Sequence, residues 1–144
     1  MAAPVVPALT LLPPIAIGLV IGAYEAILIH RDVQVASHRF GHTVHALFFA
    51  VVACVLSFNV PLVYVLIPQL KGVLILGSEL GVRIILGIIM TAKIHGVSAA
   101  LKGSGMSTAG LQETWFHSVL IGALTAASPY VFPFVQPFLP KWIK

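Results

Sequence analysis

Residues 9–30 read LTLLPPIAIGLVIGAYEAILIH, and this stretch decides the class of protein to which the chain belongs. Glu25 is the one charged residue in the run before it ends at His30. Because a helix rises about 1.5 Å per residue, the run is long enough to cross the roughly 30 Å hydrocarbon core of a bilayer. Pro13 and Pro14 fall near its start, where a missing backbone N–H is tolerated. The stretch therefore predicts a transmembrane helix.

The composition of the whole chain supports this assignment. Of its 144 residues, 59% are hydrophobic and 8% are charged, and the mean hydropathy is +1.05. A soluble domain typically carries about a quarter charged residues, so this chain lacks the polar surface that a globule in water needs. We expect a single integral membrane domain that covers residues 1–144.

Three further apolar runs have the length of a membrane span, at residues 42–58, 72–94 and 113–132. Asn59 and Pro61 break or kink the second run at its end. Residues 59–71 are too short to cross again, so they either prolong the second helix past the kink or lie near the interface. The expected fold is all-α, an integral membrane four-helix bundle with short loops.

The two ends of the chain fit a membrane protein. No Lys or Arg precedes the first apolar run, which indicates a retained helix rather than a signal peptide. The proline-rich tail, residues 131–144, ends with Trp142 between two lysines, a pattern typical of an interfacial anchor. Residues 96–112 are rich in small residues and predict a mobile loop. Cys54 lies inside an apolar run and is expected to be a buried thiol.

Small residues at four-residue spacing predict close helix packing. Gly18 and Gly22 form one such pair, and Gly77 and Gly81 form another. Ser118, Gly122 and Ala126 repeat the spacing in the last run. Small side chains let helix backbones approach each other closely, so these runs are expected to form a compact bundle.

Four crossings of alternating direction would place every histidine on one side of the membrane. This side, the histidine face, holds the end of the first run, the start of the second, the end of the third and the start of the fourth. Glu25 would lie about 7 Å below it, five residues before the end of its helix. The histidines concerned are His30, His38, His42, His45, His95 and His117.

Imidazole and carboxylate groups gathered in this way predict a site for zinc, iron or copper. Asp32, Lys93, His95 and His30 are the residues expected to tune its charge. The candidate ligands are His38, His42, His45, Glu113, His117 and Glu25.

The spacing of His38, His42 and His45, H-x3-H-x2-H, resembles one histidine box of the membrane di-iron hydroxylases and desaturases. Those families carry further boxes with adjacent histidines, and this chain has no such pair, so the resemblance assigns no family. Two other interpretations of the histidines remain open. They can bond to loops, headgroups and water, or they can form a pH-sensitive relay, because histidine titrates near neutrality.

Glu79 and Arg83 are four residues apart in the third run and predict an ion pair close to the bilayer midplane. Such a pair can lock the helix in register or meet another subunit. The alternative is that these charges line a substrate or ion route.

These patterns leave three functions open. The first is an accessory or structural subunit of a homo-oligomeric or larger membrane assembly, and the others are a metal-binding membrane enzyme or carrier and a small proton or ion transporter. The chain has no phosphate-binding P-loop, GxSxG or HExxH motif, and the sequence does not decide whether it is an enzyme. Its eight Lys and Arg residues are scattered, so we expect the bilayer and other membrane subunits as partners, and no nucleic acid. The histidine face is expected to be cytoplasmic.

Overall fold

The computed structural model describes the backbone of residues 6–32, 36–103 and 114–143, and the side chains of residues 6–30, 43–96 and 114–143. These residues are all-helical and include no strand. The helices are α1 (Leu12–Asp32), α2 (Ala36–Phe58), α3 (Val60–Leu66), α4 (Glu79–Gly103) and α5 (Trp115–Val135), with 3₁₀ turns η1 (Pro68–Gly72), η2 (Gln136–Phe138) and η3 (Lys141–Ile143).

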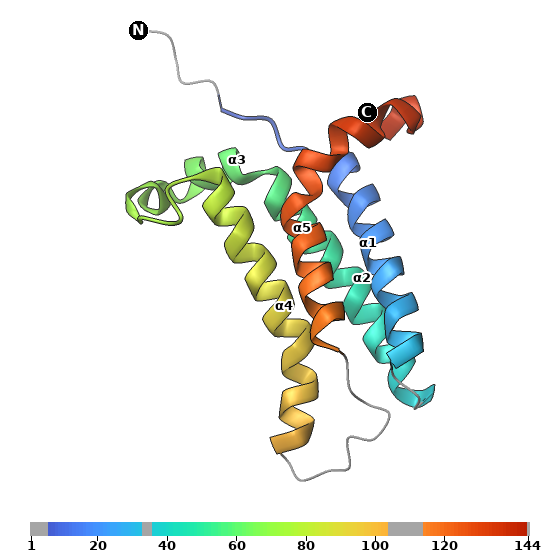
Figure 1. Cartoon of the computed structure of the whole chain (residues 1–144). Helices are drawn as coiled ribbons and strands as arrows, with labels where there is room; N and C mark the ends of the chain where they lie inside the picture. The colour runs from blue at the N-terminus through green and yellow to red at the C-terminus, as the bar shows by residue number, and fades with distance from the viewer. Residues whose placement is uncertain (1–5, 33–35, 104–113, 144) are drawn as a thin grey trace, which may run out of the picture.

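The long helices α1, α2, α4 and α5 lie side by side and alternate in direction (Figure 1). The strongest packing joins α1 to α2 and α4 to α5, and α5 also contacts α1 and α2. Tail turn η3 returns to contact α1. The start of α1, the end of α2, the start of α4 and the end of α5 therefore share one end of the molecule.

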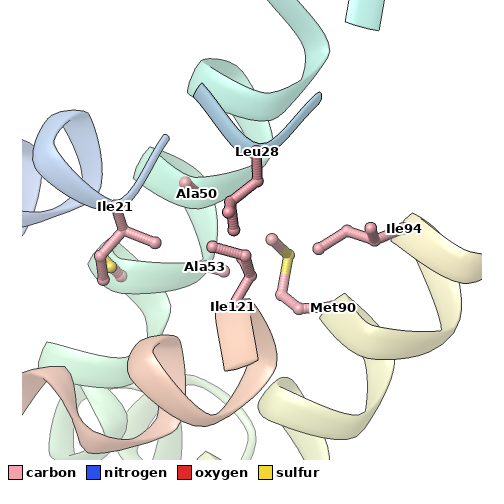
Figure 2. Packing of buried hydrophobic residues seen from close by; sticks show 8 residues of the cluster. Ile21, Leu28, Ala50, Ala53, Met90, Ile94 and Ile121 are labelled. Atoms are coloured by element: carbon pink, nitrogen blue, oxygen red, sulfur yellow. The ribbon is translucent and has the colours of Figure 1, made fainter. Parts of the chain in front are cut away.

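The core between these helices is built from one to three buried apolar side chains of each (Figure 2). Large side chains such as Leu28, Met90 and Ile121 meet the small Ala50 and Ala53 of α2, which leave room for them. Cys54 is a fully buried free thiol in the same cluster, as predicted.

Glycines set the closest contacts between helices. A Cβ added at Gly18 would lie 2.6 Å from the Cα of Val51, so α1 and α2 touch backbone to backbone. At the α4–α5 crossing, a Cβ on Gly122 would clash with the carbonyl oxygen of Gly87. The predicted packing role of Gly18 and Gly122 is confirmed. Gly77 is different, because it precedes α4 and cannot share a helical face with Gly81.

Two helix boundaries differ from the prediction. Helix α2 begins at Ala36, before the expected start at residue 42. Helix α4 covers Glu79–Gly103 instead of residues 72–94, so the expected loop at residues 96–112 begins as helix. The start of α4 at Glu79 follows from Ser78. The Oγ of Ser78 accepts a hydrogen bond from the Gly81 N–H at 3.0 Å, as a helix-capping serine does. Residues 104–113 lie outside the described part.

The predicted break after the second helix is confirmed. Helix α3 is bent by 76° from α2 at Asn59, and Pro61 occupies the first turn of α3, where its missing N–H is tolerated.

Two helical stretches in the described part are long and apolar enough to cross a membrane, Leu12–His30 and Trp115–Phe138. The bent pair α2–α3 makes a third if it counts as one span. Helix α4 carries three charged residues among its described side chains, Glu79, Arg83 and Lys93, and length and composition do not identify it as a span. Length and composition therefore identify two or three spans, and not clearly the four that we expected.

Candidate functional site

The described histidines lie in the half of the bundle where α1 ends and α5 begins, with His45 and His95 well inside α2 and α4. We call this the histidine end. It holds His30, His45, His95 and His117. The candidate residues Asp32, His38, His42 and Glu113 lie outside the described side chains, so the structure does not place them.

Glu25 is the buried carboxylate of this end. It lies on α1 with 2% of its surface exposed, and its Oε2 has no hydrogen-bond partner among the described residues. Because α1 continues to Asp32, Glu25 is about 10 Å from the end of its helix, deeper than the sequence predicted. A carboxylate in such a position needs an opposite charge or a proton.

Lys93 of α4 is a cation with an electrostatic influence on the Glu25 carboxylate, but no salt bridge between the two groups is found in the described part. The Lys93 ammonium group lies 4.5 Å from the centroid of the Phe49 ring on α2, a cation–π distance. The contact with Phe49 joins α4 to α2, and no contact between the backbones of α1 and α4 is found in the described part.

His117 is completely buried in the first turn of α5. Its backbone N–H donates to the Oγ1 of Thr114 at 3.2 Å, and Thr114 is the N-cap of α5. The neighbouring Ser118 is also buried and donates to the Thr114 carbonyl oxygen at 3.3 Å. The cap therefore fixes the start of α5 and carries His117 into the interior.

The other described histidines lie elsewhere. The His45 ring is exposed and stacks on Phe49 with the ring centroids 6.0 Å apart. The His95 ring stacks on Trp115 at 3.7 Å. His30 is exposed, and its Nδ1 lies 2.8 Å from the carbonyl oxygen of Ala26 in the same helix.

The structure does not bring Glu25, His45 and His117 together in the way that the sequence suggested. Among the described residues, no three histidine, cysteine or carboxylate groups are close enough to hold a metal ion. The physical reason is the rotation of α2 about its axis, which turns His45 outward while Glu25 and His117 point inward.

A second polar cluster is centred on Arg83 at the opposite end. Its Nη2 forms a salt bridge with Glu79 at 2.8 Å, its Nη1 donates to the Tyr130 hydroxyl at 2.8 Å, and its Nε donates to the Ser57 carbonyl at 3.1 Å. These contacts join α2, α4 and α5. Because α4 begins at Glu79, Arg83 lies in its second turn, so the expected position near the middle of the span is wrong.

Asn59 is the main polar residue whose role the sequence did not reveal. Its side chain accepts a hydrogen bond from the Thr10 N–H at 2.7 Å and donates to the Thr10 carbonyl at 2.7 Å and the Val55 carbonyl at 2.8 Å. The bend between α2 and α3 is thereby tied to the segment before α1. The sequence signal was the polar residue at a proline kink, but nothing local points to Thr10, 49 residues away.

An apolar groove of about 280 Å³ lies between α1 and α5. It offers almost no polar surface, so it can take only an apolar group such as an acyl chain or a side chain. Its lining includes Ile17, Val20 and Tyr24 from α1 and Leu124, Ser128 and Val131 from α5.

Comparisons of the chain with known protein families, with curated proteins and with solved structures find no match. The function is therefore argued from the residues and their geometry alone.

Proposed function

We propose that the chain is a multi-pass integral membrane protein whose long helices α1, α2, α4 and α5 all cross the bilayer, and that it works as an accessory or structural subunit of a homo-oligomeric or larger membrane assembly. Helices α1 and α5 are long and apolar enough to cross by themselves. Helix α4 has 25 residues and packs along α5. A helix in such contact with a spanning neighbour shares much of its depth, although the stacking of His95 on Trp115 shows that α4 extends beyond the start of α5.

The charges of α4 are compatible with a crossing. Glu79 is its first residue, Arg83 is 8% exposed and bound to three partners, and the ammonium group of Lys93 lies over the Phe49 ring of α2. Charged residues in membrane helices characteristically face the bundle interior and pair with other groups there. This arrangement supports α4 as the fourth span.

The observation that carries the proposal is the apolar outer surface of the bundle. Large apolar side chains are exposed on all four long helices, whereas a soluble monomer rarely exposes more than a small apolar patch. Lipid or neighbouring subunits must cover them. They include Leu19, Val20 and Ile27 on α1, Phe48 and Leu56 on α2, Leu80, Ile84, Ile88 and Ile89 on α4, and Phe116, Val119 and Phe134 on α5.

The described polar contacts support a structural role. Arg83 joins three helices, Asn59 joins the bend to the segment before α1, and Tyr64 donates from its hydroxyl to the Leu76 carbonyl at 2.7 Å. Each holds one part of the chain against another. This use of polar side chains favours a scaffold over a catalyst.

The proposal is tested by isolating the protein in nanodiscs formed directly from its native membrane. Light scattering and quantitative mass spectrometry then measure the number of copies and any co-purifying chain. We expect a fixed ratio of more than one subunit. A single copy without a stoichiometric companion would contradict the proposed role.

Metal binding at the histidine end is the second candidate function. The observation in its favour is that Glu25 and His117, two potential ligands, are both buried at this end. The remaining ligands would have to include His38, His42 or Glu113, which lie outside the described side chains. A proton or ion route through Glu79 and Arg83 has less support, because Arg83 is already bound to three partners near the end of its helix.

Elemental analysis of purified protein tests the metal proposal. We expect about one zinc, iron or copper per chain, lost in His117→Ala and Glu25→Gln. His30→Ala is the matched control, because His30 is exposed and bonds to its own helix. Metal below stoichiometry, or metal that survives both substitutions in folded protein, rejects this function.

A further inference from the structure

Residues 60–78 form an apolar projection beside the bundle, which we call the α3–η1 segment (Figure 1). It comprises α3, the 3₁₀ turn η1 and the turn that leads into α4. Leu66 is 71% exposed and Leu74 is 98% exposed. Four more apolar side chains in the segment are also exposed, namely Val65, Ile67, Val73 and Ile75.

The direction of the segment is fixed by the bend at Asn59. Helix α3 turns away from α2 by 76°, and the hydrogen bonds of Asn59 to Thr10 and Val55 hold the corner. If α2 crosses the bilayer, α3 must lie close to the plane of the membrane. Exposed apolar side chains on such an element face either lipid or a second protein surface.

The polar groups of the segment resemble those of an interfacial element. Tyr64 is a buried residue of α3, and its hydroxyl donates a hydrogen bond to the Leu76 carbonyl. This bond joins α3 to the turn before α4. The Lys71 ammonium lies 5.6 Å from the centroid of the Tyr64 ring and is the one charge in residues 60–78. A tyrosine beside a lysine is typical of the layer where the apolar side chains meet the headgroups.

The C-terminal tail gives a second indication of a membrane interface at this end of the bundle. Tail turn η3 contains Lys141 and the 69% exposed Trp142, and it packs against α1 at the end of the bundle where the α3–η1 segment lies (Figure 1). Tryptophan and lysine are enriched at membrane–water interfaces. Two separate parts of the chain therefore indicate an interface at this end.

We propose that the α3–η1 segment lies in the interfacial layer of one leaflet, inserts Leu66 and Leu74 among the acyl chains and binds anionic phospholipid headgroups through Lys71. The proposal rests on the proposed membrane placement. Lipid is favoured over a second copy of the chain because the exposed apolar side chains span the segment from Val65 to Ile75, and its single charge can pair with a phosphate group.

Depth-dependent quenching tests the proposal. The background is Cys54→Ala, which removes the one cysteine, and single cysteines are introduced as Leu74→Cys and, as the control, Ile88→Cys on the exposed face of α4. Each variant receives a bimane fluorophore and is reconstituted in liposomes with doxyl lipids. We expect a shallow doxyl group to quench the Leu74 label most and a deep one to quench the Ile88 label most.

A Leu74 label quenched by aqueous iodide but not by doxyl lipid, while the Ile88 label is quenched by lipid, overturns this inference alone. A Leu74 label reached by neither quencher indicates a protein contact and overturns it too. If the Ile88 label is also reached by iodide and not by lipid, the membrane placement in the proposed function fails. In the Leu74→Cys protein, doxyl groups on anionic lipids are expected to quench the label more than doxyl groups on neutral lipids. Lys71→Gln should remove this difference, and a difference that persists would refute the role of Lys71.

Discussion

Glu25 and Arg83 are both buried ionisable residues, but their hydrogen bonding differs. Arg83 donates to a carboxylate, a hydroxyl and a carbonyl, and these contacts satisfy its guanidinium group. Glu25 keeps an oxygen with no hydrogen-bond partner, and no salt bridge joins it to Lys93, among the described residues. The hydrogen bonds of Arg83 therefore favour the proposed structural role, whereas Glu25 has no comparable set of partners in the described part.

Arg83→Leu is expected to lower the free energy of unfolding by on the order of 3 kcal/mol, because it removes the donor for the Ser57 carbonyl and the Tyr130 hydroxyl. Denaturation in mixed micelles measures the loss. Glu79→Gln is the matched control. Its side chain is 46% exposed, so we expect a loss of about 0.5 kcal/mol or less. Unchanged stability of Arg83→Leu, with loss of a function of the assembly, would contradict the structural role.

The sequence predicts only part of this residue-level chemistry. The spacing of Glu79 and Arg83 is enough to suggest an ion pair, because positions four apart share a helix face. Tyr130 is 47 residues from Arg83, and Ser57 contributes a backbone carbonyl, so neither leaves a local pattern. The stacking of His95 on Trp115 depends in the same way on how two helices are offset.

At the scale of helices, apolarity locates the elements but not their ends. Residues 73–76 are as apolar as the helices beside them, yet α4 starts only at Glu79. Ser78, the cap, decides that boundary. In a chain this apolar, the hydrophobic pattern has little power to separate a helix from a turn that lies in or near lipid. Proline kinks are more reliable, as the bend at Asn59 shows.

Gly122→Ala tests the crossing of α4 and α5. The new methyl group would clash with the carbonyl oxygen of Gly87, so the helices must move apart. We expect a loss of about 1–3 kcal/mol in the free energy of unfolding. Gly96→Ala on α4 is the control, since its added Cβ meets no atom of the described residues within 4 Å beyond its own helix backbone, and it should gain up to about 1 kcal/mol. Equal effects of the two substitutions would rule out close packing at Gly122.

Asn59→Ala tests the corner between α2 and α3. It removes the hydrogen bonds to Thr10 and Val55, so we expect a loss of about 1–3 kcal/mol in the free energy of unfolding. Hydrogen exchange should also become faster at the Thr10 amide. Asn59→Asp keeps the acceptor for that amide and should protect it better than alanine does. Exchange at Thr10 that is equally slow in all three proteins would refute this role of Asn59.

At the scale of the whole molecule, alternating helices place the described histidines in one half of the bundle, and their position on one side of a membrane stays a prediction. What the sequence could not supply is the rotation of each helix about its axis. Glu25 and His117 turn inward, but His45 turns outward, and the three do not form a metal-binding group. In a membrane helix that is apolar on most sides, the hydrophobic pattern does not determine this rotation.

The number of crossings is the central claim, because it decides which residues share a side of the membrane. In the Cys54→Ala background, His30→Cys and Gly96→Cys report on the histidine end, and Gln69→Cys and Lys141→Cys report on the other end. All four positions are exposed. Each variant is reconstituted in sealed proteoliposomes of one orientation and treated with a membrane-impermeant maleimide.

This labelling is the most direct test of the account. Four crossings predict that His30→Cys and Gly96→Cys react from one side of the membrane, and that Gln69→Cys and Lys141→Cys react only from the opposite side. In cells, the first pair should react from the cytoplasmic side. If Gly96→Cys reacts from the same side as Gln69→Cys while His30→Cys reacts from the other, α4 does not cross the bilayer and the account is contradicted.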